Sequence, residues 1–210
     1  MSEIYDFPFR KVVAAAASDA PTPGGGSVSA LVGTLGVAMT AMVGNLTVGK
    51  PQYLEVEPEV KQITGAAYFI INKLEKLMAA DIAAFGKFIE VFRLPKKTDD
   101  EKVKREEMMQ KALKAATDTP MEIARVLLEA LKITGRLAKL GNKMAISDAG
   151  VAAYVCEAAL NAVLLSADIN LPLIKDEHYV QNIMAEKEQL ISKAADFKEQ
   201  AVAVVRERMK

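Results

Sequence analysis

Apolar residues recur along this chain with the period of an α-helix and nowhere with the alternation of a β-strand. The longest periodic segment runs from Glu59 to Leu94, between two prolines. At about 1.5 Å per residue it predicts a helix about 54 Å long. Two apolar rows repeat every seven residues along it, as in helices that pack against partner helices. The rows are Val60, Ala67, Leu74, Asp81 and Phe88, and Ile63, Ile70, Leu77, Ala84 and Val91.

Asp81 is the one charged residue in these rows, at a position that otherwise predicts a helical partner. A lone carboxylate is costly to bury, so it needs a partner, a proton or a function. The alternative is a slight bend of the helix that lets the Asp81 side chain reach solvent. Both interpretations stay open at this point.

The stretch PTPGGGSVSA, residues 21–30, predicts a tight loop that leads into a buried helix. Gly24, Gly25 and Gly26 relieve the backbone of steric limits, and Ser27 is a suitable N-cap. The N-terminus of a helix presents unpaired N–H groups and a positive partial charge. It therefore suits an anionic or carbonyl-bearing ligand. A flexible linker followed by an ordinary cap is the alternative.

Caps and breakers divide the rest of the chain into further helices. Thr98 has capping-box spacing, Thr119 precedes a proline at the first helical position, and Asp176 caps the last helix. Ser147 with Asp148 caps another helix. The seven predicted helices cover about 8–18, 27–47, 59–94, 98–116, 119–140, 149–167 and 176–210. The predicted fold is all-α: an elongated up-and-down bundle with two long helices, in one domain over residues 1–210.

The amino-acid composition argues against several classes of function. The chain has 27 basic residues (Lys and Arg together) and 27 acidic residues (Asp and Glu together), so its formal net charge is zero. This charge balance does not favour a general nucleic-acid or membrane-surface binder. The single cysteine, Cys156, excludes an internal disulfide and fits a reducing compartment, and no signal peptide is expected, so we expect a cytoplasmic protein. Val28–Val48 has the length of a membrane span, but its polar residues favour a buried bundle helix.

The only histidine, His178, has no metal-binding partner, so no metal site is expected.

Six polar residues interrupt or flank the apolar helices and form the candidate functional set. Asp148 has the alternative role of a helix cap, and Asn142 that of a left-handed residue ending the preceding helix. The run from Gly44 to Lys50 imitates a phosphate loop, but Pro51 stands where Ser or Thr should bind magnesium, so we reject a nucleotide triphosphatase. The set is Ser27, Asn45, Lys50, Asp81, Asn142 and Asp148.

Six motifs follow one another along the chain: PTPGGGSVSALVG, GNLTVGKPQY, DIAAF around Asp81, LPKKT, GNKMAISDAGVAA and ADINL. In this order they resemble the C-terminal family of formiminotransferase-cyclodeaminase, which comprises formimidoyltetrahydrofolate cyclodeaminases and related methenyltetrahydrofolate cyclohydrolases. The resemblance covers about Tyr5 to Lys210. It implies an all-helical homodimer, a tetrahydrofolate substrate, no metal and no redox cofactor. Because the transferase domain is absent here, we expect a stand-alone second-step enzyme.

The resemblance also implies a reaction. N10 of 5-formimidoyltetrahydrofolate attacks the formimidoyl carbon, ammonia leaves, and 5,10-methenyltetrahydrofolate forms. Asp81 and Asp148 are the expected acid and base, with the two roles left open. We expect these carboxyls and the glycine loop to share one pocket, and whether it crosses a dimer interface stays open.

The remaining residues are expected to bind the substrate. Lys50 is a candidate for the glutamate carboxylate of the folate, and Asn45 and Asn142 for the edge of the pterin. The N–H groups of the glycine loop, from Gly24 to Ser27, are an alternative site for that carboxylate or for the pterin carbonyl.

Two other functions stay open. A cyclohydrolase would add water to 5,10-methenyltetrahydrofolate and give 10-formyltetrahydrofolate through the same bicyclic cation, although we favour the deaminase. A non-catalytic helical dimer used as a scaffold would make Asp81 and the glycine loop incidental. In that case Asp81→Asn should change stability more than turnover.

Overall fold

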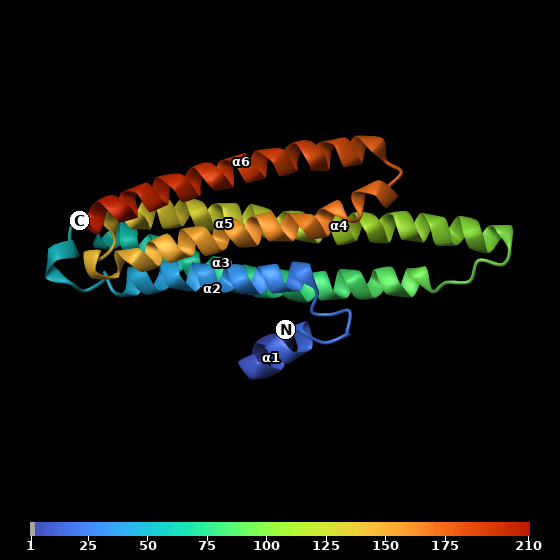
Figure 1. The fold of residues 1–210 in the computed structure, drawn as a ribbon, viewed down its shortest axis with the longest axis horizontal. Coiled ribbons are helices and arrows are strands. Elements are labelled where there is room, and N and C mark those ends of the chain that lie inside the picture. Colours follow the sequence, from blue (N-terminus) through green and yellow to red (C-terminus); the bar gives the residue numbers. More distant parts are fainter. Residues whose placement is uncertain (1–2) are drawn as a thin grey trace.

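The computed structural model describes residues 3–210 and contains only helices and their connections in that range. Six α-helices form an all-α bundle, which confirms the fold class, although seven helices were predicted (Figure 1). Met1 and Ser2, at the start of the predicted domain, lie outside the described residues. The helices are α1 Phe9–Ala16, α2 Gly25–Asn45, α3 Glu57–Phe92, α4 Asp99–Leu140, α5 Ile146–Asp168 and α6 Glu177–Arg208. Short 3-10 turns lie at Glu3–Asp6, Pro51–Tyr53, Lys143–Ala145 and Leu171–Leu173.

Helices α2 to α5 form the body of the bundle. Helix α2 packs against α3 and α5, and α4 packs against the same two helices from the other side. Helix α6 covers α4 and α5, while α1 lies apart from the bundle beside α2 (Figure 1). The α3–α4 hairpin projects beyond the start of α2, and this projection matters for the site described below (Figure 1).

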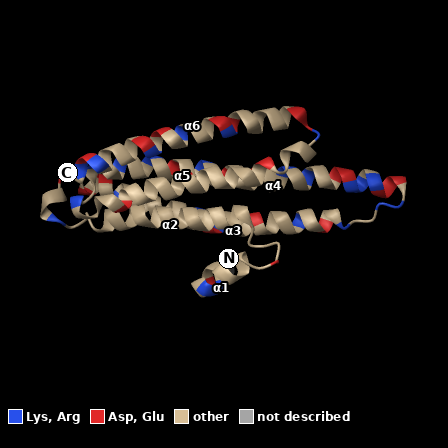
Figure 2. Ribbon diagram, viewed as in Figure 1, with Lys and Arg blue, Asp and Glu red and all other residues tan. Residues whose placement is uncertain are grey.

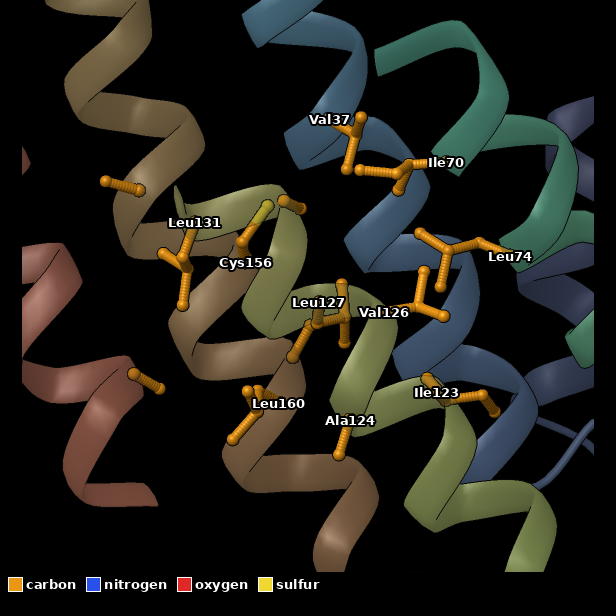
Figure 3. Close-up of a cluster of buried hydrophobic side chains, with 14 of the residues drawn as sticks. Val37, Ile70, Leu74, Ile123, Ala124, Val126, Leu127, Leu131, Cys156 and Leu160 are labelled. Carbon is orange, nitrogen blue, oxygen red and sulfur yellow. The ribbon is translucent and has the colours of Figure 1, made fainter. Parts of the chain in front are cut away.

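The core lies where the faces of these four helices meet (Figure 3). Its side chains are aliphatic and almost completely removed from solvent, so their burial supplies the main stabilising term of the fold. Cys156 is part of this core and behaves as a small apolar residue. Among the core residues shown in Figure 3 are Val37 of α2, Ile70 and Leu74 of α3, Leu127 and Leu131 of α4, and Leu160 of α5.

Glycines inside α2 mark places where neighbouring helices approach its backbone. A Cβ at Gly36 would lie 2.8 Å from the Cys156 sulfur, and one at Gly44 would overlap the Thr64 hydroxyl. The cost of glycine in a helix is therefore offset by close helix packing.

The prediction of a separate helix from Thr119 is wrong. Helix α4 runs unbroken from Asp99 to Leu140 with Pro120 buried inside it. The Thr119 hydroxyl donates to the Ala115 carbonyl within the helix rather than capping a new one. Proline removes one backbone hydrogen bond, but packing on both sides of Pro120 keeps the helix continuous.

Local capping signals had mixed outcomes. The capping box at Thr98 and the cap at Asp176 are confirmed. The caps predicted at Ser27 and at Ser147 with Asp148 are wrong, because α2 begins after Gly24 and α5 begins after Ala145. Ser27 and Asp148 instead lie within the first turns of their helices.

Two helices have the length and composition of a membrane span, α2 and the stretch Lys143–Leu173. The second was not anticipated from the sequence. Of their most apolar windows, 61% and 50% respectively are buried inside the bundle, so this signal is weak.

We predict opposite effects for two glycine substitutions. Gly44→Ala should lower the free energy of unfolding by about 1–3 kcal/mol, because the new methyl group collides with stiff, hydrogen-bonded Thr64. Gly65→Ala in α3 is the control. It has open space and should raise that free energy by roughly 0.5–1 kcal/mol through helix propensity. Urea unfolding measures both, and equal effects would contradict the packing argument.

Candidate functional site

The carboxyl of Asp81 on α3 lies against the first turn of α2. The Ser27 hydroxyl donates a hydrogen bond of 2.7 Å to Asp81 Oδ2. A Cβ at Gly26 would stand 2.5 and 2.8 Å from the two carboxyl oxygens, so only glycine admits the carboxyl here. The N-terminal end of the helix also places a positive partial charge beside it.

Opposing effects act on the pKa of Asp81. Partial burial raises it by penalising the charged form, whereas hydrogen bonds from the side chain and backbone of Ser27 lower it. Burial dominates, so the pKa of Asp81 lies above its ordinary value of 3.8. A carboxyl with a raised pKa that still has donors for its charged form is suited to proton transfer.

Asp81 opens into a cavity of about 390 Å³, large enough for part of a drug-sized ligand. Phe85 and Phe88 follow Asp81 on the same face of α3 and supply an aromatic wall. The mixture of an apolar wall, hydrogen-bonding groups and one carboxyl is typical of a small-molecule site. The cavity is lined by Pro21, Thr22, Gly24, Gly25, Gly26 and Ser27, by Asp81, Phe85, Phe88 and Ala116, and by Ser166, Ile169, Asn170 and Leu173.

A second group of predicted site residues lies at the other end of α2. Asn142 is buried there and fastens the end of α2: its backbone N–H donates to Thr47 Oγ1 (2.8 Å), and its side-chain Nδ2 donates to the Leu46 carbonyl (3.0 Å). Its Oδ1 accepts from the Met144 N–H (3.1 Å). With a φ of −56°, Asn142 is not left-handed, so that alternative is wrong. These contacts give Asn142 a structural role.

The other members of this second group are more open. Asn45 is exposed and donates to the Tyr68 hydroxyl at 2.8 Å. Lys50 is half-buried just after α2, and Asp148 is half-buried in the first turn of α5. Both side chains are placed where a ligand or a second protein chain can reach them.

One chain does not bring the two groups together. Helix α2 has 21 residues and separates its two ends by about 31 Å at ~1.5 Å per residue. On antiparallel α5, Ser166 lies beside Gly25, and Asp148 lies 18 residues earlier, about 27 Å away. The expectation of one shared pocket is therefore not met within a single chain.

No group of three or more His, Cys, Asp or Glu side chains in residues 3–210 is placed to hold a metal ion. His178 is exposed, and its ring contacts Asn182 at 3.2 Å.

Sequence reasoning missed several residues of the cavity wall, among them two aromatic and two polar side chains. Phe85 and Phe88 follow Asp81 by four and seven residues, a helical spacing that carried a usable signal. Ser166 and Asn170 come from the end of α5, where the motif ADINL was noted without any residue being chosen.

The fold and the cavity define an all-helical protein with a small-molecule cavity, and one partly buried carboxyl faces that cavity. The chain belongs to the formiminotransferase-cyclodeaminase family, whose pattern matches residues 8–189. This confirms the resemblance noted in its motifs.

Individual relatives agree with the family assignment. A methenyltetrahydrofolate cyclohydrolase of Methylorubrum extorquens is 37% identical over 92% of this chain and 93% of its own. A formimidoyltransferase-cyclodeaminase of Gallus gallus is 30% identical over 94% of this chain, which spans only 36% of that longer protein. The crystal structure of a Thermotoga maritima formiminotetrahydrofolate cyclodeaminase superposes with a TM-score of 0.87 at 30% identity, covering 98% of both chains.

We predict that NMR titration of carbon-13-labelled aspartate will give Asp81 a pKa above 3.8. Ser27→Ala should raise this pKa further, because it removes a donor that stabilises the charged carboxylate. A pKa at or below 3.8, or a fall on Ser27→Ala, would contradict the described balance of burial and hydrogen bonding.

Proposed function

We propose that this protein is a formimidoyltetrahydrofolate cyclodeaminase. The observation that carries the proposal is the partly buried Asp81 carboxyl, held by Ser27 inside a cavity with an aromatic wall. The chemistry requires such a proton-transfer group beside a substrate that carries a flat aromatic ring next to its reacting nitrogens. The Thermotoga maritima cyclodeaminase, which matches this chain over nearly its whole length, supports the assignment.

In the proposed mechanism the cavity holds the substrate with N10 close to the formimidoyl carbon. The substrate enters as the amidinium cation, and N10 attacks that carbon. Ionised Asp81 takes the N10 proton and passes it to the departing nitrogen, which leaves as ammonia. The product is the 5,10-methenyl cation, so the overall charge is conserved. The carboxylate of Asp81 stabilises the positive charge of the transition state and product.

A methenyltetrahydrofolate cyclohydrolase is the second candidate, favoured by the 37% identity to the Methylorubrum extorquens enzyme. Here water adds to the methenyl carbon of the same cation, and Asp81 takes a proton from the water. The bond between that carbon and N5 then breaks as N5 takes up a proton and the added hydroxyl loses its own, so 10-formyltetrahydrofolate leaves and one net proton is released. Both reactions place the same bicyclic cation beside Asp81.

A homodimer formed through α2 and α5 is part of the proposal. Helix α2 contains no charged residue (Figure 2). Partly or fully exposed apolar side chains recur in a stripe along its whole length, and the first of them lie beside α1. A parallel stripe follows α5, and Gly36 and Cys156 meet near the middles of the two stripes. So much exposed apolar surface favours an interface with a second copy. The stripes comprise Val28, Val32, Leu35, Met39, Met42 and Leu46, and Val151, Tyr154, Ala158, Leu165 and Ile169.

The two-fold symmetry of such a dimer would complete the site. A two-fold axis through the middle of the stripes places the end of the partner's α2 beside the start of this chain's α2. The same axis brings the start of the partner's α5 toward Ile169, which lines the cavity. Asn45, Lys50 and Asp148 of the second copy then close the cavity around Asp81. This arrangement gives the separated groups of predicted residues one common function.

The remaining properties are proposed on the same basis. The mechanism uses the side chains of the protein and the substrate alone, without a metal or redox cofactor. Zero net charge and the single core cysteine support a cytoplasmic enzyme without nucleic-acid or membrane partners.

An absorbance assay tests the proposed reaction. Purified protein is given 5-formimidoyl- or 5,10-methenyltetrahydrofolate while methenyl absorbance is followed. We expect its appearance with release of ammonia from the first compound. Loss from the second, faster than in buffer, identifies the cyclohydrolase instead. Asp81→Asn should reduce turnover by about 10²- to 10⁴-fold, whereas exposed Asp100→Asn should retain it. No change with either compound would refute both reactions.

Mixing two inactive variants tests the shared site. Asp81→Asn and Asp148→Asn should each be poorly active alone. After unfolding and joint refolding, half the dimers are mixed and each carries one intact site, so roughly a quarter of wild-type activity should return. Size-exclusion chromatography with light scattering confirms that dimers formed. Full activity of Asp148→Asn alone, or no recovery in verified mixed dimers, would contradict a site built from two chains.

A further inference from the structure

A row of phenylalanines leads from the cavity toward the projecting end of the α3–α4 hairpin. Phe85, Phe88 and Phe92 follow Asp81 on one face of α3, with successive ring centroids 6.3 Å apart. Phe92 lies 11 residues after Asp81, about 16 Å along the helix at ~1.5 Å per residue. The row therefore forms an aromatic surface that begins beside Asp81 and ends at Phe92, the last residue of α3.

Arg105 of α4 lies over the outer end of this row. Its guanidinium carbon is 5.5 Å from the centroid of Phe92, and its Nη2 donates to the Phe92 carbonyl at 3.1 Å. Its Nε is buried without a hydrogen-bond partner, alone among buried side-chain nitrogens and oxygens of residues 3–210. The buried Nε is not itself open to a ligand, but only Nη2 of this guanidinium donates a hydrogen bond within residues 3–210, which leaves Nη1 for an anionic ligand.

The surroundings of Arg105 favour a carboxylate ligand. A second hollow of about 260 Å³ lies there, lined by Arg105 with Lys104 and by apolar Leu94, Pro95 and Met108. The acidic residue in its wall, Glu101, already accepts hydrogen bonds from the Lys97 and Thr98 backbones as part of the capping box. The two cationic side chains are therefore available to an incoming anion.

We propose that Arg105 binds a carboxylate of the substrate's glutamate tail and so determines specificity for tailed folates. The inference rests on the proposed folate substrate. In a tetrahydrofolate the p-aminobenzoyl ring separates the reacting nitrogens from the glutamate carboxylates. That ring would lie along Phe88 and Phe92, and the tail would end at the guanidinium. This assigns the tail to Arg105, at the outer end of the phenylalanine row, rather than to Lys50, which in the proposed dimer closes the cavity around Asp81 at the opposite end of that row.

Binding of two stable analogues tests the assignment without turnover. Calorimetry with 5-formyltetrahydrofolate and with 5-formyltetrahydropteroate, which lacks the glutamate, compares wild type, Arg105→Ala and Arg105→Lys. Arg105→Ala should weaken binding of the tailed analogue about tenfold or more and leave the tail-less one unchanged, with partial retention in Arg105→Lys. Lys102→Ala, which removes a neighbouring exposed cation, should affect neither.

The outcomes separate this inference from the proposed function. Equal weakening of both analogues by Arg105→Ala would show a purely structural role and overturn the tail site alone. Unchanged binding of the tailed analogue would also overturn it. Failure of the wild-type protein to bind either analogue would instead refute the folate assignment, and the tail site with it.

Discussion

The contact between the Asp81 carboxyl and the first turn of α2 is the interaction on which the rest of the site depends. It requires a residue without a side chain at Gly26, a donor at Ser27, and a long α3 that carries Asp81 to the start of another helix. Elsewhere in the bundle the inward positions of α3 are mostly apolar. Removing the charged Asp81 carboxylate from water costs free energy, and the start of α2 compensates part of this desolvation cost. The uncompensated part raises the pKa of Asp81.

The same constraint explains the distribution of functional groups. The middle of a bundle of antiparallel helices is apolar and excludes water, whereas the helix ends carry polar groups. Polar side chains with a functional role are therefore expected at the ends of the bundle. The start of α2 follows the glycine loop and lies against Asp81 of α3, whereas Asn45 lies at its other end with Lys50 just beyond. A two-fold dimer through the uncharged face of α2 would bring unlike ends together and bury the exposed stripe at once. Beyond the cavity, the phenylalanine row of α3 leads along the projecting hairpin to Arg105.

Hydrophobic periodicity predicted most of the helices correctly. Predictions of helix boundaries and caps were wrong where tertiary contacts override local sequence preferences. The heptad rows predicted α3 to within two residues at each end, and the one charge in them identified Asp81. Pro120 led to the wrong prediction of a helix boundary, because packing keeps α4 continuous around this proline. Ser27 resembles a cap, yet its hydroxyl binds a residue 54 positions away. Ser166 and Asn170 reach the cavity only through the packing of α5, which no local pattern encodes. The end of α5, rather than its start, lies beside the cavity, so Asp148 in the first turn of α5 is far from Asp81. The periodic pattern does not reveal this direction.

The central claim is that the Asp81 carboxyl, tuned by Ser27, moves the proton in folate ring closure. The pH dependence of kcat/KM for wild type and Ser27→Ala tests it most directly. Because ionised Asp81 must accept the proton, activity should fall as pH drops through the pKa of Asp81. Loss of the Ser27 donor raises that pKa and should shift the fall to higher pH, by the amount that NMR finds for the carboxyl. An inflection that stays in place while the Asp81 pKa moves would contradict the account.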